Sequence, residues 1–325
     1  MGAITTEKTY TGTQLADIFY RPTLSGKSAE ELGMRVLYNM PMPLTLTLWS
    51  HAGDGIKAYQ RGFQGGDNAT RVSKTIDMTK CKLEQAFSPE DYFATVYETL
   101  TNTPNVNLQD LQGSDLEKAE TDLFRAFIRE NLRVQMWVGK KGRESKYNVF
   151  DGFLTKCLDT VNYTQLHRVS ISAAPSSSNI IATLSSVWKA APAELKTLRS
   201  SGELAYFVTS DVIDAYEAYL DSKGGTDAYK EMQNGRTVLK YHGIELIEAE
   251  VDSILADLTD MPESFVLLAP KKNLVFALNT AAMPDADVRM WYNADELENR
   301  QRACFLAGAE ILDENLVVFA SKAKA

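Results

Sequence analysis

One helical pattern in the middle of the chain constrains the possible folds more than any other segment. In "GSDLEKAETDLFRAFIRENLRVQMWVG", residues 113–139, Ser114 and Glu117 form a capping box and Gly139 supplies a stop. The pattern predicts a helix of roughly 24 residues, about 36 Å long at 1.5 Å per residue, which is long for a globular domain. Its apolar stripe consists of Leu116, Ala119, Leu123, Phe127 and Val134, with Phe124 and Ile128 beside it.

A glycine-rich stretch precedes this helix. Residues 49–78 contain five glycines and little apolar periodicity, which predicts a long two-stranded excursion that bends at its glycines. A loop of this size without a core of its own usually has a function. We therefore expect an extended loop at residues 46–82, preceded by an N-terminal arm at residues 1–45. Within the arm, "SAEELGMRVLYNM" predicts a short helix that begins with a Ser28–Glu31 capping box.

The organisation changes after a small, polar, proline-containing junction, "SAAPSSSN", at residues 172–179. A helix, the buried strand "LAYFVTS" and the helix "DVIDAYEAYLDS", capped by Ser210 or Asp211, follow it. Residues 264–279, "SFVLLAPKKNLVFALN", predict a hairpin of two apolar strands around a basic corner. Three further strand-like segments close the chain. Helices and strands are mixed rather than alternating, so the predicted fold class is α+β.

Composition excludes several classes of protein. Hydrophobic residues make up 44% and charged residues 24%, which is ordinary globular composition, and no apolar run is long enough to span a membrane. A net charge of −9 disfavours a DNA-reading surface. Cys81, Cys157 and Cys304 are widely spaced and odd in number, which favours buried thiols in a reducing compartment. No HxxxH or CxxC spacing occurs, so we expect no metal site and no cofactor.

The sequence also lacks a recognisable catalytic motif. GxSxG, HExxH and GxGxxG are absent, and the acidic residues are spread along the predicted helix faces. We therefore expect a protein without enzymatic activity. The alternative is an enzyme with a site near the junction at residues 172–179, for which Asp151, His167 and Asp211 are the residues to test.

Charge is distributed unevenly along the chain. Residues 203–260 hold thirteen acidic and four basic residues, whereas residues 49–83 hold six basic and three acidic ones. Both segments could be ordinary hydrated surface. The alternative is that a basic arm of one copy lies on acidic surface of another, which would steer association. Candidate contact residues between copies are Lys57, Arg61, Arg71 and Lys74, together with Trp291 and Tyr292, for which core packing is the other interpretation.

Taken in order, these segments resemble the major capsid protein of tailed bacteriophages, which has the Hong Kong 97 type fold. "TRVSKTIDMTKCKLEQAF" is similar to the returning strand of that family's extended loop, and "DLEKAETDLFRAFIRENLRVQMWVG" to its spine helix. "YFVTSDVIDAYEAYL", "LKYHGIELIEAEV" and "FVLLAPKKNLVFAL" resemble its axial domain, and the last strands resemble those that close its peripheral domain. The resemblance implies a peripheral domain at 83–171 and 285–325, with the spine helix at 115–138, and an axial domain at 172–284.

The resemblance further implies a structural protein of the virion that assembles with itself in the cytoplasm of a bacterial host. Hexamers and pentamers would close into an icosahedral capsid around double-stranded DNA, without sequence-specific binding and without a membrane. Portal and scaffolding proteins, and possible decoration proteins, would be its partners. Some members of the family crosslink a loop lysine, for which Lys74, Lys80 or Lys82 could be proposed here. An encapsulin-like protein compartment with the same fold is the alternative.

Overall fold

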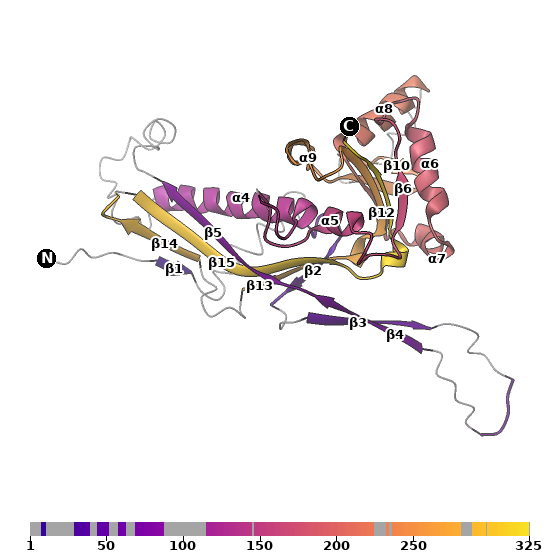
Figure 1. The fold of residues 1–325 in the computed structure, drawn as a ribbon, viewed down its shortest axis with the longest axis horizontal. Coiled ribbons are helices and arrows are strands. Elements are labelled where there is room, and N and C mark those ends of the chain that lie inside the picture. Colours follow the sequence, from indigo (N-terminus) through magenta and orange to yellow (C-terminus); the bar gives the residue numbers. More distant parts are fainter. Residues whose placement is uncertain are drawn as a thin grey trace.

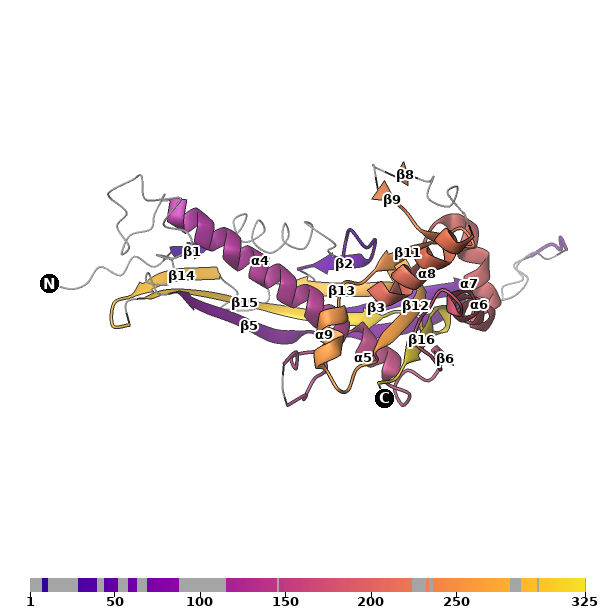
Figure 2. The ribbon, with the colours of Figure 1, turned by 90° about the horizontal axis from the view of Figure 1, so that it is seen from above.

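The computed structural model describes residues 8–10, 29–39, 44–51, 58–62, 69–87, 115–144, 146–223, 232–233, 236–280, 288–296 and 298–324. These residues form two large β-sheets, one long helix, several shorter helices and a two-stranded ribbon that projects from the body (Figure 1). One sheet and the long helix make an elongated slab, and the second sheet with its helices lies at one end of it (Figures 1 and 2). This mixture confirms the α+β class.

The first sheet is organised around its longest strand. Its strands are β1 (Lys8–Tyr10), β2 (Arg35–Tyr38), β5 (Thr79–Phe87), β13 (Leu274–Asn279), β14 (Val288–Asn293) and β15 (Glu298–Ile311). β15 pairs antiparallel with β5, β13 and β14, while β1 and β2 lie at the edges. Burial alternates along β5, which buries Cys81 and exposes Lys80 and Lys82, as expected for a strand with one face on a core.

The second sheet has the strand order β10–β11–β7–β12–β16–β6. Its strands are β6 (His167–Ser170), β7 (Leu204–Val208), β10 (Lys240–Tyr241), β11 (Ile244–Glu248), β12 (Ser264–Pro270) and β16 (Val318–Lys322). Every residue of β7 and β12 is buried, because both faces of these central strands are covered. One face packs on the helices α6 (Ile180–Ala190) and α8 (Ser210–Ser222), and the other faces the core of the slab.

The long helix α4 (Asp115–Val138) has the predicted length of 24 residues. Phe124, Ile128 and Leu132, at spacings of four, bury one face of it in the core below. Phe127 is 39% exposed. The predicted apolar stripe was therefore wrong at Phe127, and the buried face of α4 lies to one side of it. The predicted cap Ser114 lies outside the described residues.

The C-terminal end of α4 joins the two sheets. All residues from Val134 to Val138 are buried, and the Trp137 ring lies 5.7 Å from Phe207 on β7 and 6.0 Å from Phe265 on β12. Its third ring neighbour is Phe153, at 5.6 Å, on the short helix α5 (Phe153–Leu158). These aromatic contacts, together with the buried area, fix α4 to the second sheet.

Residues 264–279 form the two predicted strands but not the predicted hairpin. β12 pairs with β7 and β16 in the second sheet, whereas β13 pairs with β15 and β2 in the first. The short 3-10 turn η2 (Lys271–Asn273) carries the chain from one sheet to the other. Both strands are buried on both faces, so neither has a solvent-facing side that would have favoured pairing with the other.

Other predictions were wrong because a segment paired with strands that lie far from it in the sequence. The expected helix in the arm is a turn over 29–33 followed by β2, because Gly33 adopts a φ of +74° and the chain then pairs with β13. The last strand, β16, was predicted to close the peripheral sheet as part of 285–325. It lies in the second sheet instead, next to β6, which belongs to the segment 83–171. β13, from the segment 172–284, lies in the first sheet.

Candidate inter-subunit contact surfaces

The ribbon consists of β3 (Leu44–His51) and β4 (Ala69–Ile76), which pair antiparallel from Leu44 opposite Ile76 to His51 opposite Ala69. Eight residues of strand span about 26 Å at 3.3 Å per residue. Figure 1 shows the ribbon leaving the slab and pointing away from it. The ribbon therefore carries residues 58–62, the described part of the segment between its strands, beyond the part of the molecule that holds the cores.

The described residues of that segment are exposed. Tyr59 is 93% exposed, and Arg61 beside it is exposed as well. Single exposed apolar residues are common, but an aromatic side chain flanked by a cation at the end of a projection is a frequent kind of interface anchor. The sequence analysis did not select Tyr59, although "KAYQR", an aromatic between basic residues in a glycine-rich stretch, was the available signal.

The base of the ribbon is fixed by a partly buried ionic cluster. Lys74 on β4 lies 3.0 Å from Glu314 and 3.8 Å from Glu310, and its ammonium lies 4.5 Å from the Tyr163 ring centre. Glu310 is 5% exposed in its side chain and also binds Lys156 at 2.6 Å and the Tyr163 hydroxyl at 2.6 Å. Burial and the adjacent Glu310 carboxylate raise the pKa of Tyr163, so this hydroxyl stays protonated and donates.

A close backbone approach adds to this anchor. Gly308 on β15 faces the carbonyl oxygen of Asp77, which directly follows β4, and a Cβ at position 308 would lie 2.3 Å from that oxygen. A larger residue at position 308 would therefore push the base of the ribbon away from the first sheet. The ionic cluster and Gly308 together set the direction in which the ribbon leaves the body.

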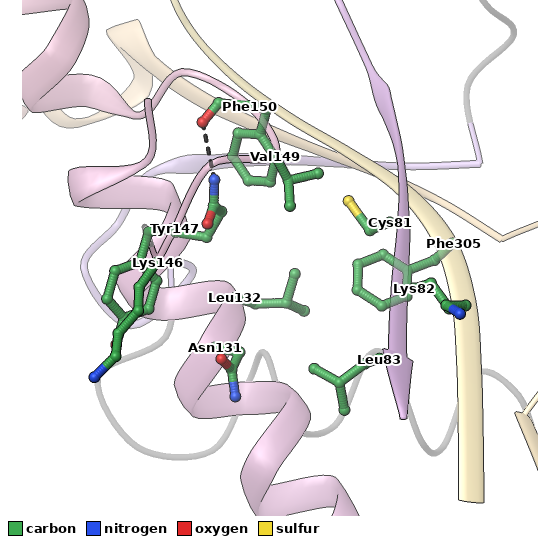
Figure 3. A pocket seen from close by; sticks show the side chains of 11 residues that line it. Cys81, Lys82, Leu83, Asn131, Leu132, Lys146, Tyr147, Val149, Phe150 and Phe305 are labelled. Atoms are coloured by element: carbon green, nitrogen blue, oxygen red, sulfur yellow. Dashed lines mark hydrogen bonds between the residues drawn. The ribbon is translucent and has the colours of Figure 1, made fainter. Parts of the chain in front are cut away.

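A groove of about 390 Å³ opens between α4, β5 and the loop at 146–150 (Figure 3). Leu83, Leu132, Val149 and Phe305 point into it, and Gln135 closes one side by donating to the Phe150 carbonyl at 2.9 Å. Lys82, Asn131, Lys146 and Tyr147 stand at its sides. The lining has no pair of carboxylates and no histidine, so the groove is suited to packing rather than to acid–base chemistry.

Solved structures with a similar fold were found by comparison. A chain of the procapsid of satellite phage P4, solved with its size determination protein, matches with a TM-score of 0.58 at 9% identity, over 97% of this chain and 91% of that one. The empty capsid of a GTA particle matches with a TM-score of 0.52 at 15% identity, over 92% and 97%. Gordonia phage Cozz matches with a TM-score of 0.51 at 11% identity, over 91% and 86%.

The chain has the Hong Kong 97 type capsid fold. The matches cover 91–97% of this chain, so the similarity concerns the fold as a whole and not one isolated element. No protein-family model and no curated protein sequence matches this chain. The fold is therefore shared at sequence identities of only 9–15%.

On this capsid fold, the six predicted contact residues are not one site. Arg61 lies in the segment between the two strands of the ribbon, and Arg71 lies on β4, where its backbone is opposite Trp49. Lys57 lies outside the described residues. Lys74 is engaged within its own chain. Trp291 and Tyr292 are half-buried on β14, at the end of the slab opposite the ribbon, and the Arg302 guanidinium lies 5.9 Å from the Trp291 ring centre.

The three residues named for an enzyme site have separate structural roles. The Asp151 carboxylate accepts from the Lys141 amide at 2.7 Å, and the Asp211 carboxylate accepts from the Ser264 hydroxyl. His167 pairs with Val318 in the second sheet. In the part of the chain that the structure describes, no hydrogen bond or ion pair joins any two of the three, and no cluster of metal-ligating side chains occurs.

Cys81 and Cys157 are buried free thiols. Burial raises the pKa of each to about 12, so neither forms a thiolate nucleophile near neutral pH. Among the described residues, no helix has the length and apolar content required to cross a membrane.

Proposed function

We propose that this protein is the main shell subunit of a tailed bacteriophage or prophage, and that copies of it assemble into a closed icosahedral capsid around double-stranded DNA. The observation that carries the proposal is the projecting ribbon on a capsid fold. The ribbon reaches past its own body, and Tyr59 and Arg61 are exposed where another molecule can meet them. Many such contacts per shell, each weak, would together make the assembly stable.

The individual parts support the same role. α4 on the first sheet forms a long rigid slab, and we assign it as the spine of a peripheral domain. We assign the second sheet, with α6 and α8, to an axial domain that would face the symmetry axes of pentamers and hexamers. We assign Arg61 and Arg71 to contacts between copies, with Trp291 and Tyr292 as a second contact at the far end of β14. Lys74 is assigned to the anchor of the ribbon.

Nonspecific affinity for DNA comes from lysine and arginine at phosphates, so a net charge of −9 would limit adhesion of the shell to the DNA that it encloses. This charge agrees with DNA as the contents of the shell and not as a specific ligand. Portal, scaffolding and decoration proteins are the partners that such a shell would need, assembled in the cytoplasm of a bacterial host.

Electron microscopy and sedimentation velocity of the purified full-length chain test the proposal. We expect rings of five or six copies and closed shells, with nuclease-protected DNA in particles isolated from the producing cell. A chain that remains monomeric at every concentration, with or without a co-expressed scaffolding protein, would overturn the proposal. Small shells that contain protein cargo and no DNA would instead identify an encapsulin-like compartment.

A further inference from the structure

A short turn directly after α5 presents two apolar side chains to solvent. Leu158 is 37% exposed and Val161 is 79% exposed. The Asp159 carboxylate closes the turn, because it accepts from the Val161 amide at 2.9 Å and from the Asn162 amide at 3.0 Å. We call residues 158–162 the knob.

The knob is held in shape within its own chain. Arg168 donates from Nε to the Cys157 carbonyl oxygen at 2.8 Å, and from a terminal amino group to the Asp159 carbonyl oxygen at 2.7 Å. The Asn162 side chain donates to the Asp159 carboxylate at 2.7 Å, and this bond is the main cause that lowers the pKa of Asp159. The knob therefore carries a negative charge beside its apolar side chains, and an ordered loop loses little entropy on binding.

The groove between α4, β5 and residues 146–150 has the complementary character (Figure 3). Its volume is about 390 Å³, which is large enough for a few side chains. Its apolar lining includes Leu83, Leu132, Val149 and Phe305. Lys82 and Lys146 stand at its sides. Lys82 also pairs with Glu84 at 2.8 Å, but both side chains are at least half exposed, so this pair is weak and Lys146 is the stronger attraction for an anion.

The wall of the groove at residues 146–150 is also fixed. Tyr147 has a φ of +58°, which is uncommon for a residue other than glycine and persists only where neighbouring contacts hold it. The Lys140 amide donates to the Tyr147 carbonyl oxygen at 2.9 Å, and Gln135 donates to the Phe150 carbonyl oxygen at 2.9 Å. The groove is therefore preformed, as the knob is.

Charge decides which apolar side chain suits this groove. Among the described residues, the exposed large apolar side chains are Tyr59, Phe127, Leu158 and Val161. Tyr59 lies beside Arg61, whose positive charge would repel Lys146. Phe127 stands on α4 itself, one turn before Asn131 at the side of the groove, so it belongs to the surface that receives a partner. The knob combines apolar side chains with a carboxylate.

We propose that the knob of one copy of this chain inserts into the groove of a second copy, with Val161 among the apolar side chains and Asp159 toward Lys146. The knob does not line the groove of its own chain, so the contact requires another molecule. The inference rests on the proposed function and deepens it, because it names a contact between subunits. Each copy carries both halves, and repetition of the contact gives a closed assembly when the rotation between copies allows.

Cysteine pairs test the contact in the full-length chain. Val161→Cys with Lys146→Cys places one thiol on the knob and one beside the groove. Mild oxidation of the assembled protein should link roughly half of the subunits into covalent dimers and larger species on a non-reducing gel. Val161→Cys with Lys141→Cys is the matched control, because Lys141 is exposed in a nearby loop but does not line the groove. The control pair and each single cysteine variant should give about tenfold less linkage.

A charge on the knob tests the same contact through assembly. Val161→Asp would bring a carboxylate into the apolar lining of the groove, so we expect the assembled fraction to fall about tenfold. Val161 is largely exposed in the subunit, so the variant should fold normally, which thermal unfolding verifies. Thr164→Asp adds the same charge at an exposed position beyond the knob and should assemble like the wild type. Sedimentation velocity and electron microscopy measure assembly.

Equal linkage in the two cysteine pairs, or no linkage in particles that still form, would overturn the inference and leave the proposed function intact. A folded Val161→Asp variant that assembles like the wild type would do the same. Linkage of Tyr59→Cys to Lys146→Cys in place of the knob pair would also overturn it, because the ribbon would then occupy the groove. A wild-type chain that stays monomeric would overturn both the inference and the proposed function.

Discussion

The C-terminal end of α4 and the β3–β4 ribbon represent two opposite uses of an extended element. The end of α4 is buried on all sides from Val134 to Val138 and contacts aromatic residues of both β7 and β12. The ribbon projects from the body and is attached near its base by Lys74 and by the close approach at Gly308. The helix therefore contributes to the stability of the subunit, whereas the distal ribbon contributes little to it and is available for contacts with other molecules.

The largest effect is expected when an aspartate is placed on the buried face of α4 in one variant and on its exposed face in another. Ile128→Asp places a carboxylate at a fully buried position without a partner and should cost more than about 4 kcal/mol, which prevents soluble expression. Phe127→Asp, one residue earlier, should fold, because Phe127 is 39% exposed. Soluble yield and thermal unfolding measure both. An insoluble Phe127→Asp variant beside a soluble Ile128→Asp variant would show that the buried face of α4 is misplaced.

Shortening the ribbon should remove assembly and leave the fold. His51 and Ala69 are directly paired, so an Asn-Gly turn can replace residues 52–68 and join the two strands as a tight hairpin. We expect an unchanged free energy of unfolding in urea and a loss of closed particles in electron microscopy. Normal shells from this variant would contradict the role proposed for the ribbon.

Weakening the anchor should have a smaller, intermediate effect. Lys74→Met removes the ion pairs with Glu314 and Glu310. It should lower the free energy of unfolding by only about 1 kcal/mol, because Lys74 and Glu314 are partly exposed and the nearly buried Glu310 keeps its pair with Lys156. Hydrogen exchange should increase in β4 near Lys74 more than in β7. Tyr163→Phe is the matched control within the cluster, since it keeps the ring beneath Lys74 but removes the hydroxyl that donates to Glu310. Equal protection of β4 in the Lys74→Met variant and the wild type would argue against the anchor.

The smallest effect is expected from charges on the ribbon itself. Arg61→Glu with Arg71→Glu should reduce assembly several-fold at low ionic strength and much less at high ionic strength, because salt screens exposed charges. Light scattering during assembly at the two ionic strengths measures the difference. An equal reduction at both would show that the two arginines act through packing or through ribbon conformation instead of charge.

Local patterns in the sequence predicted several elements correctly. The helix at 115–138, the helix α8 and the strands β7, β12 and β13 follow from apolar spacing and capping residues, which act over a few residues. The face of α4 was predicted less well, because Phe127 and Phe124 are equally apolar and only the position of the neighbouring sheet distinguishes them.

The candidate contacts were harder to predict from sequence. Arg61 was selected from its position in a glycine-rich stretch, and its exposure agrees with that choice. Lys74 was selected on the same basis, yet it pairs with Glu310 and Glu314, which lie more than two hundred residues away. A pairing over such a sequence distance leaves no local signal. The stacking of the Trp188 ring on His242 likewise depends on the turn at His242 meeting α6 (Ile180–Ala190).

The sequence by itself determined most of the segments that are helix, strand or projection, because backbone propensity, capping and apolar periodicity are local properties. The exception is the segment at 29–38, which forms a turn and β2 instead of the predicted helix. Only the tertiary structure decided which sheet each strand joins, as β12 and β13 demonstrate. A strand that is apolar on both sides carries no preference for a particular partner, so its place depends on which surfaces the rest of the chain brings to it. For the same reason, the partners of Lys74 and the exposure of Phe127 emerged only when the distant segments were packed together.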